Sequence, residues 1–178
     1  MTVILGIDPG SRRAGFGVVT LVGGRPEYLA SGLIRAGKEA LAERLGEIHA
    51  GTAALVAQYR PAAVAVEDVF VARDPRAALR LGQARGAALA AVAAAGIPVV
   101  EYSPRTVKQA VVGTGAATKE QVQRMVMQIL RLPAAPPPDA ADALAVAICH
   151  AHGGLGGVPQ GARRRGRVRS LAGLGLSA

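Results

Sequence analysis

Two apolar segments of this 178-residue chain each end in an acidic residue. Residues 3–7 run into Asp8, and residues 63–66 run into Glu67. Apolar runs of this kind are typical of strands buried on both faces, and active sites of open α/β sheets lie at the carboxyl ends of strands. If the two strands are neighbours, we expect Asp8 and Glu67 to face each other across one interstrand gap of about 5 Å.

A second pair of acids, Asp139 and Asp142, opens an apolar segment near the end of the chain. Their spacing of three residues places both side chains on one face of the first turn of a helix. The residues that follow, Ala143, Leu144 and Val146, predict that this helix packs against the rest of the protein. We therefore expect the two aspartates to point toward the rim of the fold.

Four carboxylates gathered at one site would repel one another, so that without cations at least one would hold a proton. Oxygen ligands without cysteine or clustered histidine favour Mg²⁺ or Mn²⁺. Two such ions about 4 Å apart can activate water and hold the departing oxygen of a phosphodiester. The net charge of +9 favours a polyanionic partner, most often nucleic acid. The sequence therefore predicts a metal-dependent nuclease.

Each acid also has a purely structural interpretation. Asp8 begins a good turn sequence with Pro9 and Gly10, and Glu67 has the position of an ordinary charge at a strand end. Asp139 follows three prolines, where an N-cap is expected, and Asp142 would favour the positive end of a helix. It is the joint pattern that favours a site.

The spacing of apolar residues in the elements that must position these acids changes along the chain, from strand-like to helix-like. The first third predicts strands over residues 2–8, 15–22 and 27–35, with a hairpin turn at Gly23-Gly24. Helical spacing follows over residues 41–59, then a strand over 63–67, a helix over 75–95 and a strand over 97–102. Ser103-Pro104 predicts a helix start, Thr118 with Gln121 predicts a capping box for a helix to about Leu132, and a last helix spans 139–152.

This order predicts an α/β fold with a five-stranded mixed sheet. The first three strands form an antiparallel meander, the last two add in parallel through crossover helices, and helices cover both faces. We expect one domain over residues 1–152. Residues 153–178 predict a flexible, basic Gly/Arg-rich tail with five arginines between positions 163 and 169.

Composition excludes several classes of protein. Hydrophobic residues make up 51% of the chain and charged residues 19%, which excludes a disordered protein. The single cysteine, Cys149, excludes an internal disulfide and a cysteine-based zinc site. The longest apolar run, residues 86–100, contains Pro98 and falls short of the roughly 20 residues of a membrane-spanning helix. With no signal-peptide pattern at the N-terminus, we expect a cytoplasmic protein without membrane association.

Five segments together resemble one family of nucleases, in order and at fitting spacings from about Met1 to His152. They are Ile4-Leu5-Gly6-Ile7-Asp8-Pro9-Gly10, Val66-Glu67-Asp68-Val69-Phe70, Leu81-Gly82-Gln83-Ala84-Arg85-Gly86, Val107-Lys108-Gln109-Ala110-Val111-Val112-Gly113 and Asp139-Ala140-Ala141-Asp142-Ala143-Leu144-Ala145. The chain is therefore similar to the RuvC family of bacterial Holliday-junction resolvases.

This resemblance implies a ribonuclease-H-like fold, a homodimer and the four-way DNA junction of recombination and repair as substrate. It implies symmetric nicking by two-metal-ion hydrolysis, with two Mg²⁺ or Mn²⁺ ions per site and ends that carry 5′-phosphate and 3′-hydroxyl groups. The family's metal-binding catalytic acids map onto Asp8, Glu67, Asp139 and Asp142. RuvA and RuvB are implied as partners by the resemblance only.

Candidate DNA contacts lie near the acids in the sequence or match family positions. The set is Phe70, Arg73, Arg76, Arg80, Lys108 and Lys119. An exposed aromatic side chain beside arginines fits base stacking, although Phe70 has the alternative of a core position. Arg76 and Arg80 have the spacing to grip phosphates or to form a solvated helix face. The two lysines match family lysines near the scissile strand.

Three other functions are compatible with parts of the pattern. A related ribonuclease-H-like nuclease would act on RNA or on another branched structure, and a junction-binding protein without catalysis would lack metal-dependent cleavage. Actin-like kinases also begin with a Gly-x-Asp-x-Gly strand, but they need two such lobes, and this chain has one copy.

Overall fold

The computed structural model describes residues 1–37, 40–68 and 74–153. Its five strands form one mixed sheet in the order β3-β2-β1-β4-β5. The strands are β1 (Thr2–Asp8), β2 (Arg13–Val22), β3 (Arg25–Arg35), β4 (Ala63–Glu67) and β5 (Val99–Tyr102). β1 pairs antiparallel with β2 and parallel with β4, and β5 extends the parallel side. The predicted mixed sheet is confirmed.

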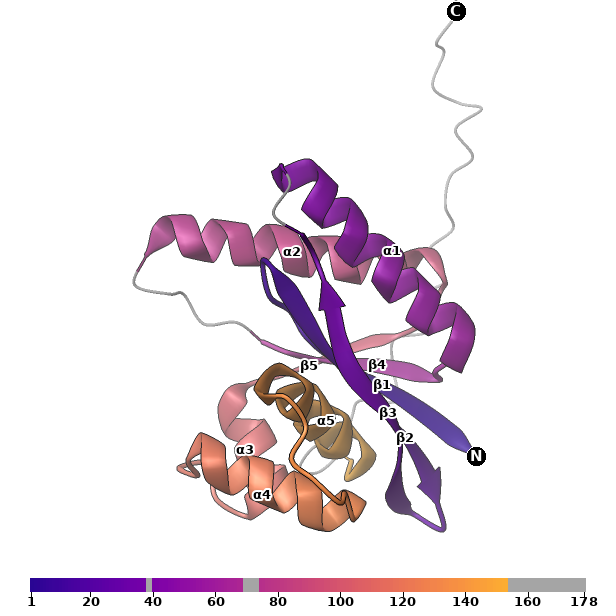
Figure 1. The fold of residues 1–178 in the computed structure, drawn as a ribbon. Helices are drawn as coiled ribbons and strands as arrows, with labels where there is room; N and C mark the ends of the chain where they lie inside the picture. The colour runs from indigo at the N-terminus through magenta and orange to yellow at the C-terminus, as the bar shows by residue number, and fades with distance from the viewer. Residues whose placement is uncertain (38–39, 69–73, 154–178) are drawn as a thin grey trace, which may run out of the picture.

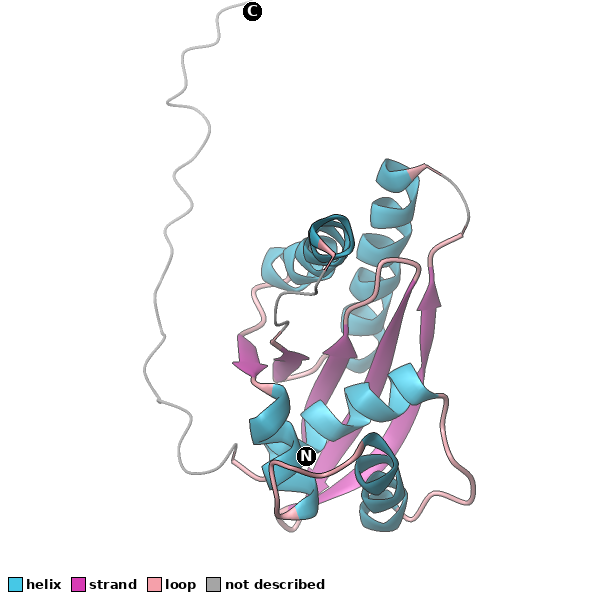
Figure 2. Cartoon of the chain, turned by 90° about the vertical axis from the view of Figure 1, so that its left-hand side faces the viewer, coloured by secondary structure: helices cyan, strands magenta, loops and turns pink. Residues whose placement is uncertain are grey.

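Helices cover both faces of the sheet, as predicted (Figures 1 and 2). They are α1 (Leu41–Tyr59), α2 (Pro75–Ala94), α3 (Pro104–Val112), α4 (Lys119–Leu130) and α5 (Pro138–Ala151). One core joins α1 and α2 to the face that carries Leu5, Val18 and Val64. The other core joins the last three helices to the opposite face. Alternate residues of the central strands therefore serve two separate cores.

Local sequence signals account for most element boundaries. Gly23 and Gly24 both have positive φ, as a tight hairpin turn requires. The Ser103 hydroxyl accepts a hydrogen bond from the Thr106 amide, and Thr118 and Gln121 form the predicted capping box. The structure corrects some starts by one or two residues: β2 and β3 begin earlier than predicted, and β5 begins later, at Val99. Pairing with the neighbouring strand fixes the residue at which each strand begins, and the turn residues in the sequence do not reveal this pairing.

Helix α5 lies unusually close to the sheet, over a face lined by glycines. A Cβ atom added at Gly6 would overlap the carbonyl oxygen of Ala143, and one at Gly15 would overlap that of Asp139. At Gly17 it would lie 2.7 Å from Leu144. Near its other end, α5 is held to β5 by a 2.7 Å hydrogen bond between the Tyr102 hydroxyl and Nδ1 of His150. The glycines therefore set how deeply α5 sits.

None of the helices in the described ranges has the length and apolar character needed to cross a lipid bilayer. The predicted boundary between a nuclease domain and a basic tail stays a prediction. Gly153 closes the last described turn, and residues 154–178 lie outside the described residues.

We predict that Gly6→Ala destabilises the protein by several kcal/mol, because the added methyl group meets helix backbone that cannot rotate away. Gly46→Ala is the matched control. Gly46 lies in α1 with open space around its Cα, so alanine there should be neutral or stabilise by up to about 1 kcal/mol. Urea unfolding of both variants tests this, and equal stabilities would contradict the close packing of α5.

Candidate active site

The site is built at the carboxyl ends of two adjacent parallel strands. Ile7 of β1 pairs in register with Val66 of β4, so the next residues, Asp8 and Glu67, are neighbours at the same sheet edge. The antiparallel partner of Asp8 is Gly15 of β2. The predicted adjacency of the two acidic strand ends is therefore confirmed.

Helix α5 brings the second pair of acids to this edge. Asp139 is the second residue of α5, and its backbone lies directly over Gly15, the cross-strand partner of Asp8. Asp142 follows on the same helix face. The alternative of Asp139 as an N-cap is wrong: the cap is Pro137, and no side chain caps the helix. The Asp139 carboxylate is thus available for other partners.

The four carboxylates influence one another. Burial, followed by the nearby charges of Asp142, Glu67 and Asp139 in that order, raises the pKa of Asp8 to about 7. Burial also raises the pKa of Glu67, with Asp142 as the next cause. Mutual repulsion in a half-buried setting therefore works against full ionisation of the set.

Two cations offset part of this negative charge. Nε of Arg13 lies 2.5 Å from an Asp139 oxygen, and Nζ of Lys119 lies 2.7 Å from an Asp142 oxygen. The hydrogen bond to Asp142 raises the pKa of Lys119. Both cations are largely exposed, whereas both carboxylates are mostly covered. Each α5 aspartate therefore has one cationic partner at the surface.

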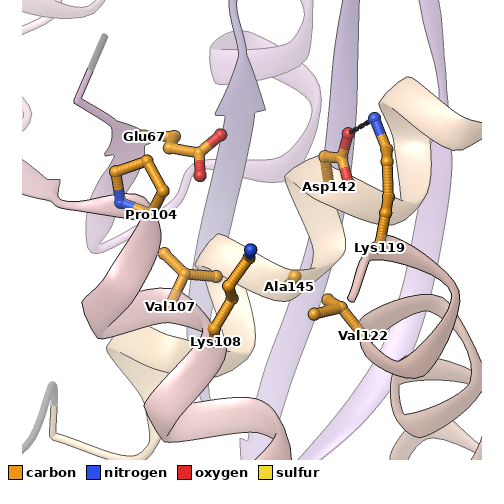
Figure 3. A pocket seen from close by; sticks show the side chains of 8 residues that line it. All are labelled: Glu67, Pro104, Val107, Lys108, Lys119, Val122, Asp142 and Ala145. Carbon is orange, nitrogen blue, oxygen red and sulfur yellow. Dashed lines mark ion pairs between the residues drawn. The ribbon is translucent and has the colours of Figure 1, made fainter. Parts of the chain in front are cut away.

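Beside the acids lies a pocket of about 190 Å³ (Figure 3). Glu67 reaches in from the end of β4, and Asp142 with Lys119 forms the opposite side. Lys108 extends from α3 into the space between them. The floor is apolar, lined by Pro104, Val107, Val122 and Ala145. The pocket thus combines both signs of charge with an apolar base, which suits a phosphodiester and its sugar.

The donor set fits a hard divalent cation. All four side chains offer carboxylate oxygens, the ligands that Mg²⁺ and Mn²⁺ prefer. Among the described residues, no three aspartate, glutamate, histidine or cysteine side chains converge closely enough to form a ready-made metal cage. Asp139 and Asp142 are instead paired with Arg13 and Lys119. A metal ion would therefore have to exchange with these resident cations.

The other predicted DNA contacts are distributed unevenly. Lys108 and Lys119 line the pocket. Arg76 and Arg80 are exposed on the first turns of α2, on the opposite face of the sheet from α5, and Nε of Arg80 bonds the Arg76 carbonyl at 3.2 Å. The structure therefore does not bring these arginines into the pocket. Phe70 and Arg73 lie outside the described residues.

Sequence reasoning missed Arg13. It lies five residues after Asp8, where β2 returns antiparallel beside β1, and only the pairing of Asp8 with Gly15 reveals that it borders the acids. The available signal was the hairpin itself, because residues just after a turn lie beside those just before it.

Comparisons with known proteins match this sequence and fold over most of the chain. Residues 4–150 match the family model described as crossover junction endodeoxyribonuclease RuvC. The chain is 57% identical over 152 residues to that enzyme of Tolumonas auensis, covering 85% of this chain and 88% of the relative. It resembles T. thermophilus RuvC in complex with Holliday junction substrate, with 42% identity, a TM-score of 0.81, and coverage of 85% and 94%.

A more distant structure shows the fold alone. The yeast mitochondrial Holliday junction resolvase Ydc2 is 12% identical, with a TM-score of 0.63 over 85% of this chain and 79% of its own. The arrangement of strands and helices is therefore shared at a level where sequence similarity has largely disappeared.

We predict that Asp8→Asn stabilises the metal-free protein at high pH. Folding raises the pKa of Asp8 from 3.8 to about 7. The protonated carboxyl group thus favours the folded state, and this contribution is complete below about pH 4 and lost as the pH rises through 7. The variant should gain at most about 4 kcal/mol at pH 8 and little at pH 4.

Urea unfolding in EDTA at both pH values measures this difference. A gain of equal size at pH 4 and pH 8 would contradict the charge explanation, because it would indicate better packing of the amide.

Proposed function

The chain belongs to the RuvC family of crossover junction endodeoxyribonucleases, and we propose that Asp8, Glu67, Asp139 and Asp142 are the metal-binding catalytic residues with which it cuts. The protein is a hydrolase that resolves Holliday junctions in DNA recombination and repair. This family membership decides against a junction-binding protein without catalysis and against a nuclease for RNA.

One observation carries the assignment of the acids. Burial is the largest cause that raises the pKa of Asp8, and the three other carboxylates are all among the further causes. A fold gains nothing in stability from such crowding, because each added negative charge makes the others harder to ionise. Crowded, partly buried acids of this kind are characteristic of functional sites.

The four acids would hold Mg²⁺ or Mn²⁺, and we propose two ions per site. Bound there, the ions would supply Lewis-acid activation of water and of the phosphodiester. The protein itself provides a rigid base for the ligands, because two come from adjacent strand ends and two from a helix packed against the same sheet. Hydrolysis adds water to the phosphorus and breaks its bond to O3′, which takes up a proton and leaves as a 3′-hydroxyl opposite a 5′-phosphate.

Lys108 and Lys119 act on the phosphate in this proposal. Both line the pocket, and both are among the charges that lower the pKa of Glu67. A cation beside the scissile group stabilises the negative charge that develops on its oxygens. Val107 and Val122 add apolar surface to the lining of the pocket, where water finds few hydrogen-bonding partners.

Symmetric resolution requires two such sites, and we propose that a homodimer supplies them. Each protomer would nick one of two strands of like polarity. RuvA and RuvB remain partners implied by the family resemblance, and a cytoplasmic location remains a prediction. We propose Arg76 and Arg80, with Arg73, as contacts to the junction arms, and the tail of residues 153–178 as a sequence-independent phosphate contact.

We predict that Glu67→Gln lowers cleavage of a synthetic four-way junction by more than about 100-fold, since changes behind a metal ligand alone cost 10- to 100-fold. Junction binding should be retained or tightened, because a negative charge near the DNA is lost. Glu27→Gln, an exposed carboxylate in β3 at the far end of the sheet, is the control and should cut normally. Denaturing gels and a binding assay measure both steps. A Glu67→Gln protein that cuts at the wild-type rate would refute the assignment.

A separate prediction concerns Phe70, which follows Glu67 by three residues in the sequence. If Phe70 opens the junction by stacking on a base, Phe70→Ala should slow cleavage of an intact junction about 5- to 150-fold, the equivalent of roughly 1–3 kcal/mol. A junction with unpaired bases at its centre should recover much of the rate, because its bases are already unstacked. Equal slowing on both substrates, with a large fall in Tm, would instead identify Phe70 as a core residue.

A further inference from the structure

Arg13 occupies a special position at the edge of the candidate active site. It begins β2, two residues before Gly15, and therefore faces the same side of the sheet as Gly15 and α5. Its guanidinium reaches the Asp139 carboxylate, with Nε 2.5 Å from Oδ2. Asp139 is one of the four acids proposed to hold metal. Arg13 thus pairs with a carboxylate that, in the proposed function, has to bind a metal ion instead.

The exposure of the Arg13–Asp139 ion pair allows a competing cation to break it. The Arg13 side chain is 62% exposed, whereas that of Asp139 is only 24% exposed. An exposed ion pair contributes about 0–1 kcal/mol to stability, because the free guanidinium interacts with water almost as favourably as it does with the carboxylate. Asp139 is fixed by the packing of α5 on Gly15, but Arg13 has a long side chain at the surface. A divalent ion can therefore displace Arg13 without disturbing the helix.

A second arginine, Arg35, indicates where the side chain of Arg13 would bind after it leaves Asp139. Arg13 pairs in register with Arg35 of β3, so both side chains rise from the same face of the sheet. Arg35 is exposed and lies on the edge strand. Two like charges directly opposite each other are unfavourable unless an anion lies between them. Guanidinium groups bind phosphate oxygens in a two-pronged geometry, which makes a DNA phosphate the fitting anion.

We propose that Arg13 is a metal-coupled DNA contact. It pairs with Asp139 while that carboxylate is free, and it turns to a junction phosphate beside Arg35 once Asp139 holds a divalent ion. This inference rests on the proposed metal site. It extends the DNA-binding surface to the β2–β3 side of the acids, away from the pocket that Lys108 and Lys119 line.

The first test measures metal binding without DNA. Arg13→Gln removes the competing charge and keeps much of the side-chain length, so Mn²⁺ titrated into the protein by calorimetry should bind about two- to fivefold more tightly. Arg35→Gln should leave the affinity near the wild-type value, because the ion-pair partner of Asp139 is Arg13. Arg25→Gln is the matched control: Arg25 is an exposed arginine on the same strand, at its opposite end.

The second test measures junction binding as a function of salt, in EDTA and in Ca²⁺, with the junction shown to be uncut on a denaturing gel afterwards. Each lost phosphate contact lowers the slope of the log–log plot by about 0.9. For Arg13→Gln, we expect this loss in Ca²⁺ and none in EDTA, where Asp139 already occupies the guanidinium. Arg35→Gln should lose slope in both conditions.

Two results would overturn the inference: an unchanged Mn²⁺ affinity for Arg13→Gln, or a loss of salt slope that is the same in EDTA and in Ca²⁺. The first result would indicate that Arg13 only helps to hold α5 in place. The second would indicate that Arg13 contacts DNA whether or not a metal ion is bound. Failure of the proposed metal site is a different result, because the wild-type protein itself would then bind no Mn²⁺ and cut no junction.

Discussion

The approach of α5 to the sheet is the constraint on which the site depends. Asp8 and Glu67 are fixed by β1 and β4, but Asp139 and Asp142 reach them only because the helix backbone lies against strands that carry no side chain there. Gly15 is the critical residue, since it pairs with Asp8 across the strands and packs directly against the backbone of Asp139. One methyl group at that point would separate the two halves of the site.

That closeness has an electrostatic cost which the rest of the fold must offset. Neighbouring carboxylates help to raise the pKa values of Asp8 and Glu67, and burial prevents water from screening these two groups fully. Two apolar cores on opposite faces of the sheet supply the compensating stability. Lys119 and Arg13 reduce the repulsion locally, but as surface ion pairs they do so weakly. If the acids hold metal as proposed, the site is a region where stability is exchanged for the capacity to bind cations.

Much of this architecture could be predicted from local sequence patterns. Apolar strands ending in Asp8 and Glu67, the capping box at Thr118 and the hairpin at Gly23 each depend on neighbours in the chain, so the sequence alone reveals them. The seating of α5 and the Arg13–Asp139 pair depend on register between segments more than 100 residues apart. Periodicity carries no information about such register. The hairpin could indicate that Arg13 lies near Asp8, but nothing local in the sequence reveals that Gly15 lies under α5 or that Arg13 reaches Asp139.

In the proposed function, charge balance accounts for how the same residues would serve both the free protein and the DNA complex. Without a ligand, the four carboxylates are opposed in the described part of the chain by Arg13, Lys108 and Lys119, and the remaining negative charge is relieved when Asp8 holds a proton. A DNA phosphate adds a further negative charge and would be repelled by this arrangement. Divalent ions held at the proposed metal site would reverse the balance, because they would neutralise the acids and free the side chains of Arg13 and Lys119 for the phosphates. Metal binding and DNA binding would then be coupled through the resident cations, and a site crowded with negative charge would become able to accept a polyanion.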